Sequence, residues 1–151
     1  MRYKSESQSS FTGTAAASDK VIHDLAQFRY ALRKFLRFSE SAARRSDVTP
    51  QQHQLMLGVA GFTGRGSATV SELAEFLQER PHSVLGLINR AALSGLVRRM
   101  PDKVDRRVVH VVLTSRGKAI LAQLSQLHQQ EAHRIQQFLA DRMPADLRQK
   151  T

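Results

Sequence analysis

The chain has 151 residues, enough for one domain with a real hydrophobic core. Its 23 Lys and Arg against 13 Asp and Glu give a formal net charge of +10, which favours a polyanionic partner over a merely cationic soluble protein. The absence of cysteine excludes disulfides, thiolate metal ligands and cysteine redox sensing. No apolar run approaches the ~20 residues of a membrane span, and no secretory signal is evident, so we expect a cytoplasmic protein.

The N-terminal third is predicted to be a tail followed by one long helix. Residues 1–17 are rich in Ser, Thr, Gly and Ala, with little to bury, so we expect a flexible tail. Ser18 can cap a helix within residues 18–48. Its apolar residues repeat at spacings of four and three, as in a helix that packs along another: Val21, Leu25, Phe28, Leu32 and Phe35. Thr49-Pro50 begins a second helix, and Gly61, Gly64 and Gly66 end it in a loop.

Two short helices follow, with a tight joint between them. Thr69 to Glu72 is a capping-box pattern at the start of the first. Pro81 fits the first turn of the second helix, where its missing N–H costs nothing, and Gly95 can end it in the left-handed conformation. A pair of this kind is the helix-turn-helix unit that places its second helix in the major groove of DNA.

The next segment reads as strand, turn, strand. Leu96–Met100 and Val108–Leu113 are the strands, and residues 101–107 form a polar tip. Between Arg98 and Arg107 there are five cations against two acids. This pattern predicts a basic, two-stranded wing directly after the helix pair.

A last long helix begins after Thr114, which can cap it. Its apolar seam is Ile120, Leu124, Leu127, Ile135 and Phe138, and Pro144 permits a short terminal helix through Leu147. The first and last helices are too long for the core of one small domain, so we expect a homodimer about a two-fold axis. The alternative is a monomer whose end helices pair only with each other.

At these residues the chain resembles the multiple-antibiotic-resistance regulator (MarR) family of winged-helix transcription factors. The matching pieces occur in the family's order: Thr49-Pro50-Gln51-Gln52, Val70-Ser71-Glu72-Leu73-Ala74, Ser94-Gly95-Leu96-Val97-Arg98-Arg99, Asp105-Arg106-Arg107 and Leu113-Thr114-Ser115-Arg116-Gly117. The resemblance covers roughly residues 19–146 and implies a mainly α fold with a small β-wing, a winged helix-turn-helix dimerised through its terminal helices. The expected parts of one domain over 18–151 are a dimerisation helix (18–48), the DNA-binding region (49–113) and C-terminal dimerisation helices (114–151).

Two sets of residues are candidates for contact with DNA. In the second short helix, the core takes the apolar face, which leaves Pro81, His82, Ser83, Leu85, Gly86, Asn89 and Arg90 facing outward for base edges and phosphates. In the wing the candidates are Arg98, Arg99, Lys103, Asp105, Arg106 and Arg107. A cation can enter the narrow minor groove, and Asp105 can hold the guanidinium of Arg107 in place, the roles that the resemblance implies for this pair. The alternative at each position is ordinary solvated surface.

The sequence gives no support to an enzyme. It has no glycine-rich phosphate loop, no Gly-x-Ser-x-Gly elbow and no His-Glu-x-x-His spacing, so we expect no catalytic residues, metal or cofactor. His128 and Glu131 lie three apart and could touch a metal, although a Gln-rich solvated helix face is the simpler interpretation. His110 is most simply an outward-facing strand residue.

A small-molecule effector is a further expectation, because family members often hold one where the dimer helices meet the winged domain. The candidate pocket residues are Phe28, Arg29, Leu32, Arg33, Leu36, His53 and Leu57, a mixture that suits a small aromatic acid. Ordinary core with surface cations is the alternative.

Together with these residues, the resemblance implies a bacterial, nucleoid-associated regulator that binds a pseudo-palindromic duplex operator, as a repressor relieved by a small aromatic or phenolic ligand. One alternative is an architectural DNA-coating protein with weak sequence preference and no effector, which would show a steep salt dependence but little specificity. Another is a winged helix used for protein contacts, which would show no salt-dependent DNA affinity.

Overall fold

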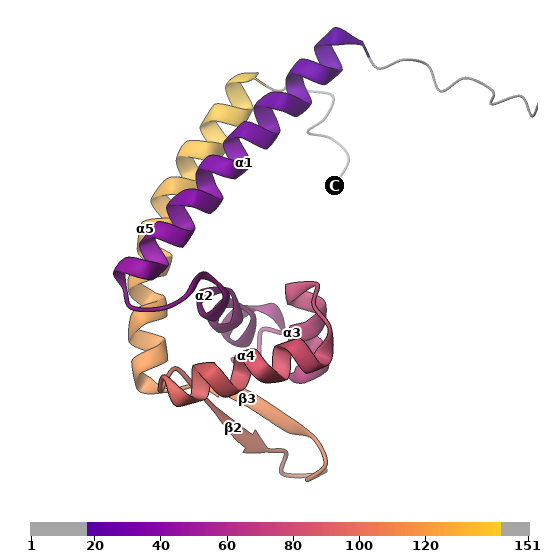
Figure 1. The fold of residues 1–151 in the computed structure, drawn as a ribbon, viewed down its shortest axis with the longest axis vertical. Coiled ribbons are helices and arrows are strands. Elements are labelled where there is room, and N and C mark those ends of the chain that lie inside the picture. The colour runs from indigo at the N-terminus through magenta and orange to yellow at the C-terminus, as the bar shows by residue number, and fades with distance from the viewer. Residues whose placement is uncertain (1–17, 143–151) are drawn as a thin grey trace, which may run out of the picture.

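The computed structural model describes residues 18–142, and the tail predicted for 1–17 and the helix predicted after Pro144 lie outside the described residues. The elements in chain order are α1 (Asp19–Arg45), α2 (Pro50–Leu57), the π-helical turn η1 (Gly58–Phe62), β1 (Ser67–Thr69), α3 (Val70–Leu77), α4 (Pro81–Leu93), β2 (Val97–Pro101), β3 (Val109–Leu113) and α5 (Ser115–Arg142). Figure 1 shows α1 and α5 as a long helical pair, with α2, α3, α4 and the β2–β3 wing gathered at one end. The mainly α fold with a small β-wing is confirmed.

The helix boundaries follow from side-chain caps. The Thr69 hydroxyl accepts from the Glu72 amide at 3.3 Å, while the Glu72 carboxylate accepts from the Thr69 amide at 2.8 Å, so the predicted capping box is present. At the end of α4, Gly95 has φ +70° and lets the Leu96 amide donate back to the Ala91 carbonyl at 2.9 Å. The Thr114 hydroxyl accepts from the Gly117 amide at 3.0 Å and caps α5.

The sheet has three strands, whereas the sequence predicted two. Its order is β1-β3-β2 and both pairings are antiparallel, with Val97 opposite Leu113 and Ser67 opposite Val112. The additional strand β1 follows a loop in which Gly64 and Gly66 have φ of +74° and +72°, conformations that glycine adopts without steric cost. These two residues, expected only to end the preceding helix, turn the chain back along β3. Strand β1, through its pairing with β3, therefore connects the wing to the helices.

A continuous core ties the wing to the helices. Leu55, Leu73, Ile88 and Leu96 are fully buried in it, from α2, α3, α4 and the start of the wing. The start of α5 packs directly against the backbone at the start of the wing, because a Cβ on Gly117 would overlap the Leu96 carbonyl oxygen. The orientation of α5 against the wing thus depends on glycine at this position.

The helix α1 packs along α5 through small and polar side chains. Its buried positions include Asp24, Ala31, Ser39 and Ala42. Of the apolar seam predicted for α1, Val21, Leu25, Phe28 and Leu32 stay exposed, whereas Phe35 is half-buried against His128. Ile22 and Leu36 beside the seam are exposed as well. In α5 the outcome differs, because Leu124 is fully buried in the protomer core and does not belong to a seam that awaits a partner. Leu127, another residue of the seam predicted for α5, is exposed.

The junction between the helical pair and the winged domain is an enclosed cluster of aromatic rings. His128 on α5 contacts the Ser39 hydroxyl at 2.8 Å and the Leu124 carbonyl at 2.6 Å. Its ring lies edge-on to Phe35 and Phe38 and 4.7 Å from the ring of His53 on α2. Burial, and secondly the proximity of His128, lowers the pKa of His53 to about 4.

Because His53 is only 1% exposed and both of its ring nitrogens lack a hydrogen-bond partner, its neutral form belongs to the folded state. Above pH 6.5, the ordinary pKa of histidine, His53 is neutral in both the folded and the unfolded chain. Below pH 6.5 the unfolded chain binds a proton at His53, whereas the folded chain binds one only near pH 4. Stability should therefore fall as the pH falls through this window, by roughly 3 kcal/mol in all.

Denaturant unfolding at pH 7, 6 and 5 tests this prediction. A His53→Leu variant should lose less stability on acidification than the wild type, because leucine has no proton to gain. The exposed His23, replaced by Leu, serves as the matched control and should keep the wild-type pH dependence. An identical pH dependence in His53→Leu and the wild type would show that the His53 ring is not held neutral.

Candidate nucleic-acid interface

The helix α4 turns one face to the core and the other to solvent. Val84, Leu87, Ile88 and Ala91 are buried, as predicted. Pro81, His82, Ser83, Leu85, Asn89 and Arg90 are exposed and Gly86 is partly exposed, but Ser83 and Arg90 lie on the side of α4 that lines a cavity toward α1 and α2. The Arg90 guanidinium folds back along this helix, since a Cβ on Gly86 would lie 3.4 Å from its Nη1. The exposed residues of α4 thus include small, amide-bearing and cationic side chains.

The wing is connected to α4 by one polar contact. Arg99 on β2 donates from Nη2 to the Oδ1 atom of Asn89. The contact holds the Asn89 amide next to a cation and leaves its NH₂ group to donate outward. Two predicted contact residues that are ten positions apart in the chain therefore act as one unit.

At the wing tip, Asp105 and Arg107 form the predicted pair. Arg107 donates from Nε to Oδ1 at 3.1 Å and from Nη2 to Oδ2 at 3.2 Å, a two-bond fork. The Arg107 side chain is nevertheless 91% exposed, so Asp105 orients the guanidinium without burying it. Its side chain and backbone amide both donate to Asp105 and hold the pKa of that carboxyl below its usual range. The side chains of Arg98, Lys103 and Arg106 are exposed as well.

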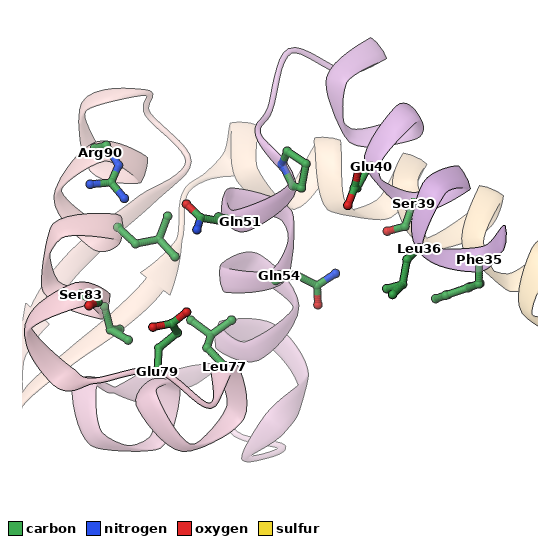
Figure 2. A pocket seen from close by; sticks show the side chains of 13 residues that line it. Phe35, Leu36, Ser39, Glu40, Gln51, Gln54, Leu77, Glu79, Ser83 and Arg90 are labelled. Atoms are coloured by element: carbon green, nitrogen blue, oxygen red, sulfur yellow. The ribbon is translucent and has the colours of Figure 1, made fainter. Parts of the chain in front are cut away.

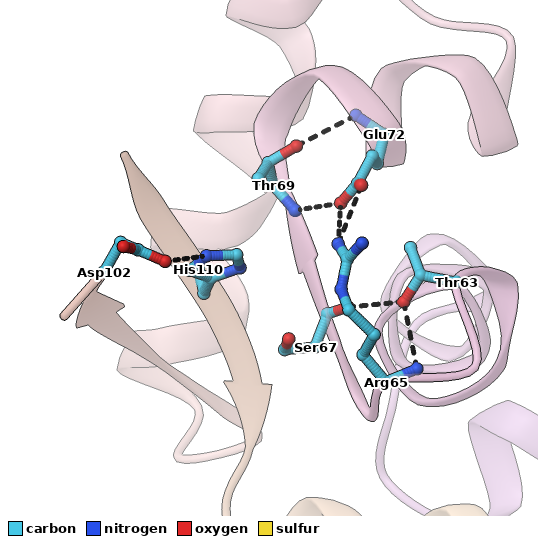
Figure 3. A network of polar contacts seen from close by, with 7 residues as sticks. All are labelled: Thr63, Arg65, Ser67, Thr69, Glu72, Asp102 and His110. Carbon is cyan, nitrogen blue, oxygen red and sulfur yellow. Dashed lines mark hydrogen bonds and ion pairs between the residues drawn. The ribbon is translucent and has the colours of Figure 1, made fainter. Parts of the chain in front are cut away.

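A second carboxylate, Asp102, organises the tip, and the sequence interpretation missed it. Its Oδ1 accepts from the amides of Val104 and Asp105 at 2.8 and 3.0 Å, and its Oδ2 contacts His110 Nε2 at 3.0 Å (Figure 3). The two amides and His110, in that order, lower the pKa of Asp102. His110 is therefore a partner that anchors the tip to β3, and not simply an outward-facing strand residue. The Pro101-Asp102 pair at the start of the tip was a signal for this turn, since an Asp side chain commonly accepts a hydrogen bond from the backbone amide two residues later.

The other polar network in Figure 3 fixes the start of α3. Arg65 donates from Nη2 to both oxygens of Glu72 at 2.7 Å, next to the capping box that Glu72 makes with Thr69. The Arg65 side chain, and secondly the Thr69 amide, lowers the pKa of Glu72. This network joins the loop before β1 to the first helix of the pair.

Two cavities flank α4, and their linings carry opposite charge. One cavity, of about 490 Å³, lies between the start of α3, the helix α4 and the wing. Its lining includes Leu85, Val109, Arg99 and Arg107. The other, of about 510 Å³, lies between α1, α2 and α4, with Glu40, Glu79 and Arg90 in its lining (Figure 2).

The pocket residues predicted from the sequence do not share one of these cavities. Of that set, Leu36 lines the cavity between α1, α2 and α4. His53 is enclosed in the ring cluster and Leu57 packs against the core. The remaining residues of the set are exposed on α1: Phe28, Arg29, Leu32 and Arg33.

Within residues 18–142, no cluster of three or more His, Cys, Asp or Glu could hold a metal ion. His128 lies in the ring cluster, and Glu131 instead pairs with Arg134 at 3.3 Å. None of the described helices is both long and apolar enough to cross a membrane.

Comparison with known proteins gives consistent findings. The model of the MarR family matches residues 46–108, which run from the end of α1 to the wing tip. Curated protein sequences give no match. Among solved structures, wild-type MarR from E. coli in its apo form is 25% identical, with a TM-score of 0.60 over 87% of this chain and 89% of that one. A point mutant of E. coli MarR complexed with operator DNA is 25% identical, with a TM-score of 0.61 over 85% of this chain and 87% of that one.

AbsC, a MarR family transcriptional regulator from Streptomyces coelicolor, shares the fold with a TM-score of 0.69 at 21% identity, over 89% of this chain and 88% of that one. The family match covers the helix pair and the first strand of the wing, and these structural matches each cover more than four fifths of the chain. Residues 46–108 match the model of the MarR family, and the fold of the chain is similar to that of MarR family transcription regulators.

Proposed function

We propose that this protein binds duplex DNA with sequence specificity, as a dimer, and represses transcription until a small ligand releases it. The observation that carries the proposal is the shared outward face of α4 and the wing, where Asn89 and Arg99 are joined and Arg107 is aimed by Asp105. The E. coli MarR mutant complexed with operator DNA supports it by analogy.

The two parts of this face have different tasks. The outward residues of α4 read base edges in the major groove, where Asn, Ser and Arg side chains distinguish base pairs. The wing tip places Arg107 at the minor groove, whose negative potential attracts a guanidinium. Arg98, Lys103 and Arg106 contact phosphates, which position the protein without reading sequence. Affinity comes largely from counterions that these cations displace, while α4 supplies specificity.

Dimerisation supplies the second α4 that a palindrome requires. The exposed apolar face of α1, with Leu25 at 57% and Leu32 at 41% exposure, is a row of large apolar side chains of the kind that mark an interaction surface. We propose that a second copy covers this face together with Leu127 of α5. A two-fold axis then presents both recognition helices to one side of the duplex.

Ligand release is proposed at the basic cavity between α3, α4 and the wing. Leu85 and Val109 offer apolar contact to an aromatic ring, and Arg99 and Arg107 offer charge to a carboxylate. A small aromatic acid bound there competes with Asp105 for the Arg107 fork and with DNA for both arginines. Release then needs no distant rearrangement. In the cell, we propose that the protein is cytoplasmic and associated with the nucleoid.

The first experiment is selection of bound duplexes from random DNA. The proposal predicts an imperfect palindrome whose half-site centres lie about 10 base pairs apart, one helical turn. Asn89→Ala should relax the preference at one position in each half-site and leave the spacing unchanged. Recovery of sequences with no common motif would favour the architectural alternative instead.

The wing gives a prediction whose sign separates two mechanisms. Arg107→Ala should weaken operator binding by about 1–3 kcal/mol and reduce the slope of log K against log salt. Asp105→Ala should weaken binding as well, although it removes a negative charge from the face. The reason is that Arg107 loses the carboxylate that aims it.

Fluorescence anisotropy with a labelled operator measures both wing variants, and melting temperatures equal to the wild type serve as the folding control. Tighter binding by Asp105→Ala would mean that the tip is only a cationic patch.

The dimer prediction uses the exposed seam of α1. Leu25→Glu combined with Leu32→Glu should dissociate the protein and abolish operator binding, because two carboxylates would face the same apolar surface of the partner. Sedimentation equilibrium at micromolar concentration measures the mass, and His23→Glu, exposed elsewhere on α1, should remain a dimer. A wild-type protein of monomer mass would end this part of the proposal. Leu124 is unsuitable for the test, because its replacement would disrupt the protomer core.

A further inference from the structure

Arg99 reaches α4 because of its position in strand β2. In the register of the sheet, Arg99 lies opposite Val111, and Val97 lies opposite Leu113. Alternate residues of a strand share one face of the sheet. Arg99 therefore lies on the same face as Val97 and Val111, which are buried in the core that the helices share, and its guanidinium donates to Asn89 of α4. The neighbouring Arg98 lies on the opposite face of the sheet.

The bond to Arg99 fixes the orientation of the Asn89 amide. An asparagine can turn either its oxygen or its NH₂ group toward a neighbour, but a guanidinium has only N–H donors and bonds only the oxygen. The NH₂ group of Asn89 is therefore turned away from Arg99, and no hydrogen bond within residues 18–142 engages it. Both side chains are exposed, and no ion pair in this range joins Arg99 to a carboxylate. The pair thus presents N–H donors to solvent, while its one carbonyl oxygen accepts from a cation.

Asn89 lies where a base edge would meet the helix. Residues three and four apart share a face of an α-helix, so His82, Leu85 and Asn89 form one exposed row along α4. This row lies away from Ser83 and Arg90, which line the cavity toward α1 and α2. The donors of the Asn89–Arg99 pair therefore belong to the face proposed to enter the major groove.

We propose that the Asn89–Arg99 pair reads guanine in the major groove of each half-site. The proposal rests on the proposed function and names a base that the α4 face selects. Guanine presents two acceptors there, N7 and O6, whereas adenine and cytosine each present an amine. Guanine accepts from the NH₂ group of Asn89 and from the remaining N–H groups of Arg99 together. An amine of adenine or cytosine would instead lie beside the guanidinium, donor against donor.

Arg99 thereby determines which base Asn89 selects. An asparagine without such a neighbour pairs with adenine through both its oxygen and its NH₂ group. Arg99 removes this option, because it occupies the oxygen and places a positive charge beside it. Its role differs from that of a phosphate contact, which would strengthen binding to every sequence alike.

Removal of Arg99 should therefore change the preferred base. In Arg99→Met the Asn89 oxygen is free, so the amide can bond N6 and N7 of adenine, and the guanine position should become adenine. Arg99→Ala is a second variant with the same expectation. Arg98→Met is the matched control, since it removes the same charge from the opposite face of the same strand. It should weaken binding and reduce the salt dependence, but keep guanine.

The test is selection of bound duplexes from random DNA by the full chain and each variant. Asn89→Ala identifies the position, because the preference there should relax. Fluorescence anisotropy then gives dissociation constants for the selected duplex with G·C or A·T at that position. The wild type should prefer guanine at least about fivefold, and Arg99→Met should prefer adenine. Melting temperatures establish that every variant is folded.

A wild-type motif with another base at this position, or an Asn89→Ala motif identical to that of the wild type, would overturn the proposal. Arg99→Met that keeps guanine and loses only salt dependence would overturn it too, since Arg99 would then contact a phosphate. Arg99→Met that selects no base there would assign guanine to Arg99 alone and overturn the shared reading. All these outcomes leave the proposed function intact, because a common motif is still selected. If the wild type selects no common motif, the proposed function fails, and the guanine reading fails with it.

Discussion

The winged domain meets the long helices at a largely buried contact, where His128 of α5 lies against Ser39 of α1 and His53 of α2, and where Ala42 and Leu124 join the core of the winged domain. The direction of α4 relative to the helical pair depends on this contact, because α2 carries the core on which α3 and α4 pack. His53 has no hydrogen-bond partner there, so the cluster tolerates its ring only while it is neutral. The rings of Phe35, Phe38 and His53 thus pack around His128 at this junction.

Charge is instead distributed on the two sides of α4. The wing side gathers Arg99, Arg107 and the Asp105 carboxylate that aims one of them, which suits a polyanion. The inner side faces a cavity whose lining includes Glu40 of α1 and Glu79 of the joint before α4. One helix of thirteen residues thus has an outward face for the proposed DNA contact and an inner face toward a cavity.

Much of this arrangement was predictable from the sequence, because its signals are local. The capping box at Thr69, the left-handed Gly95 and the alternation in the wing each specify their own element. The fork between Asp105 and Arg107 was predictable from a spacing of two residues. What the sequence did not reveal depends on contacts between distant segments. Strand β1 needs β3, Asp102 needs His110, and Leu124 lies in the core because α5 crosses the winged domain. Periodicity alone does not say which apolar face meets the protomer and which meets a partner.

The central claim is that α4 reads sequence while the wing supplies affinity. The most direct test is the ratio of dissociation constants for a selected palindrome and for random duplex DNA, measured at several salt concentrations. We expect at least about a thousandfold preference for the palindrome at physiological salt, and a ratio that varies much less with salt than either constant. Nearly equal constants that share one steep salt dependence would contradict it, and would leave a basic protein that coats DNA without reading it.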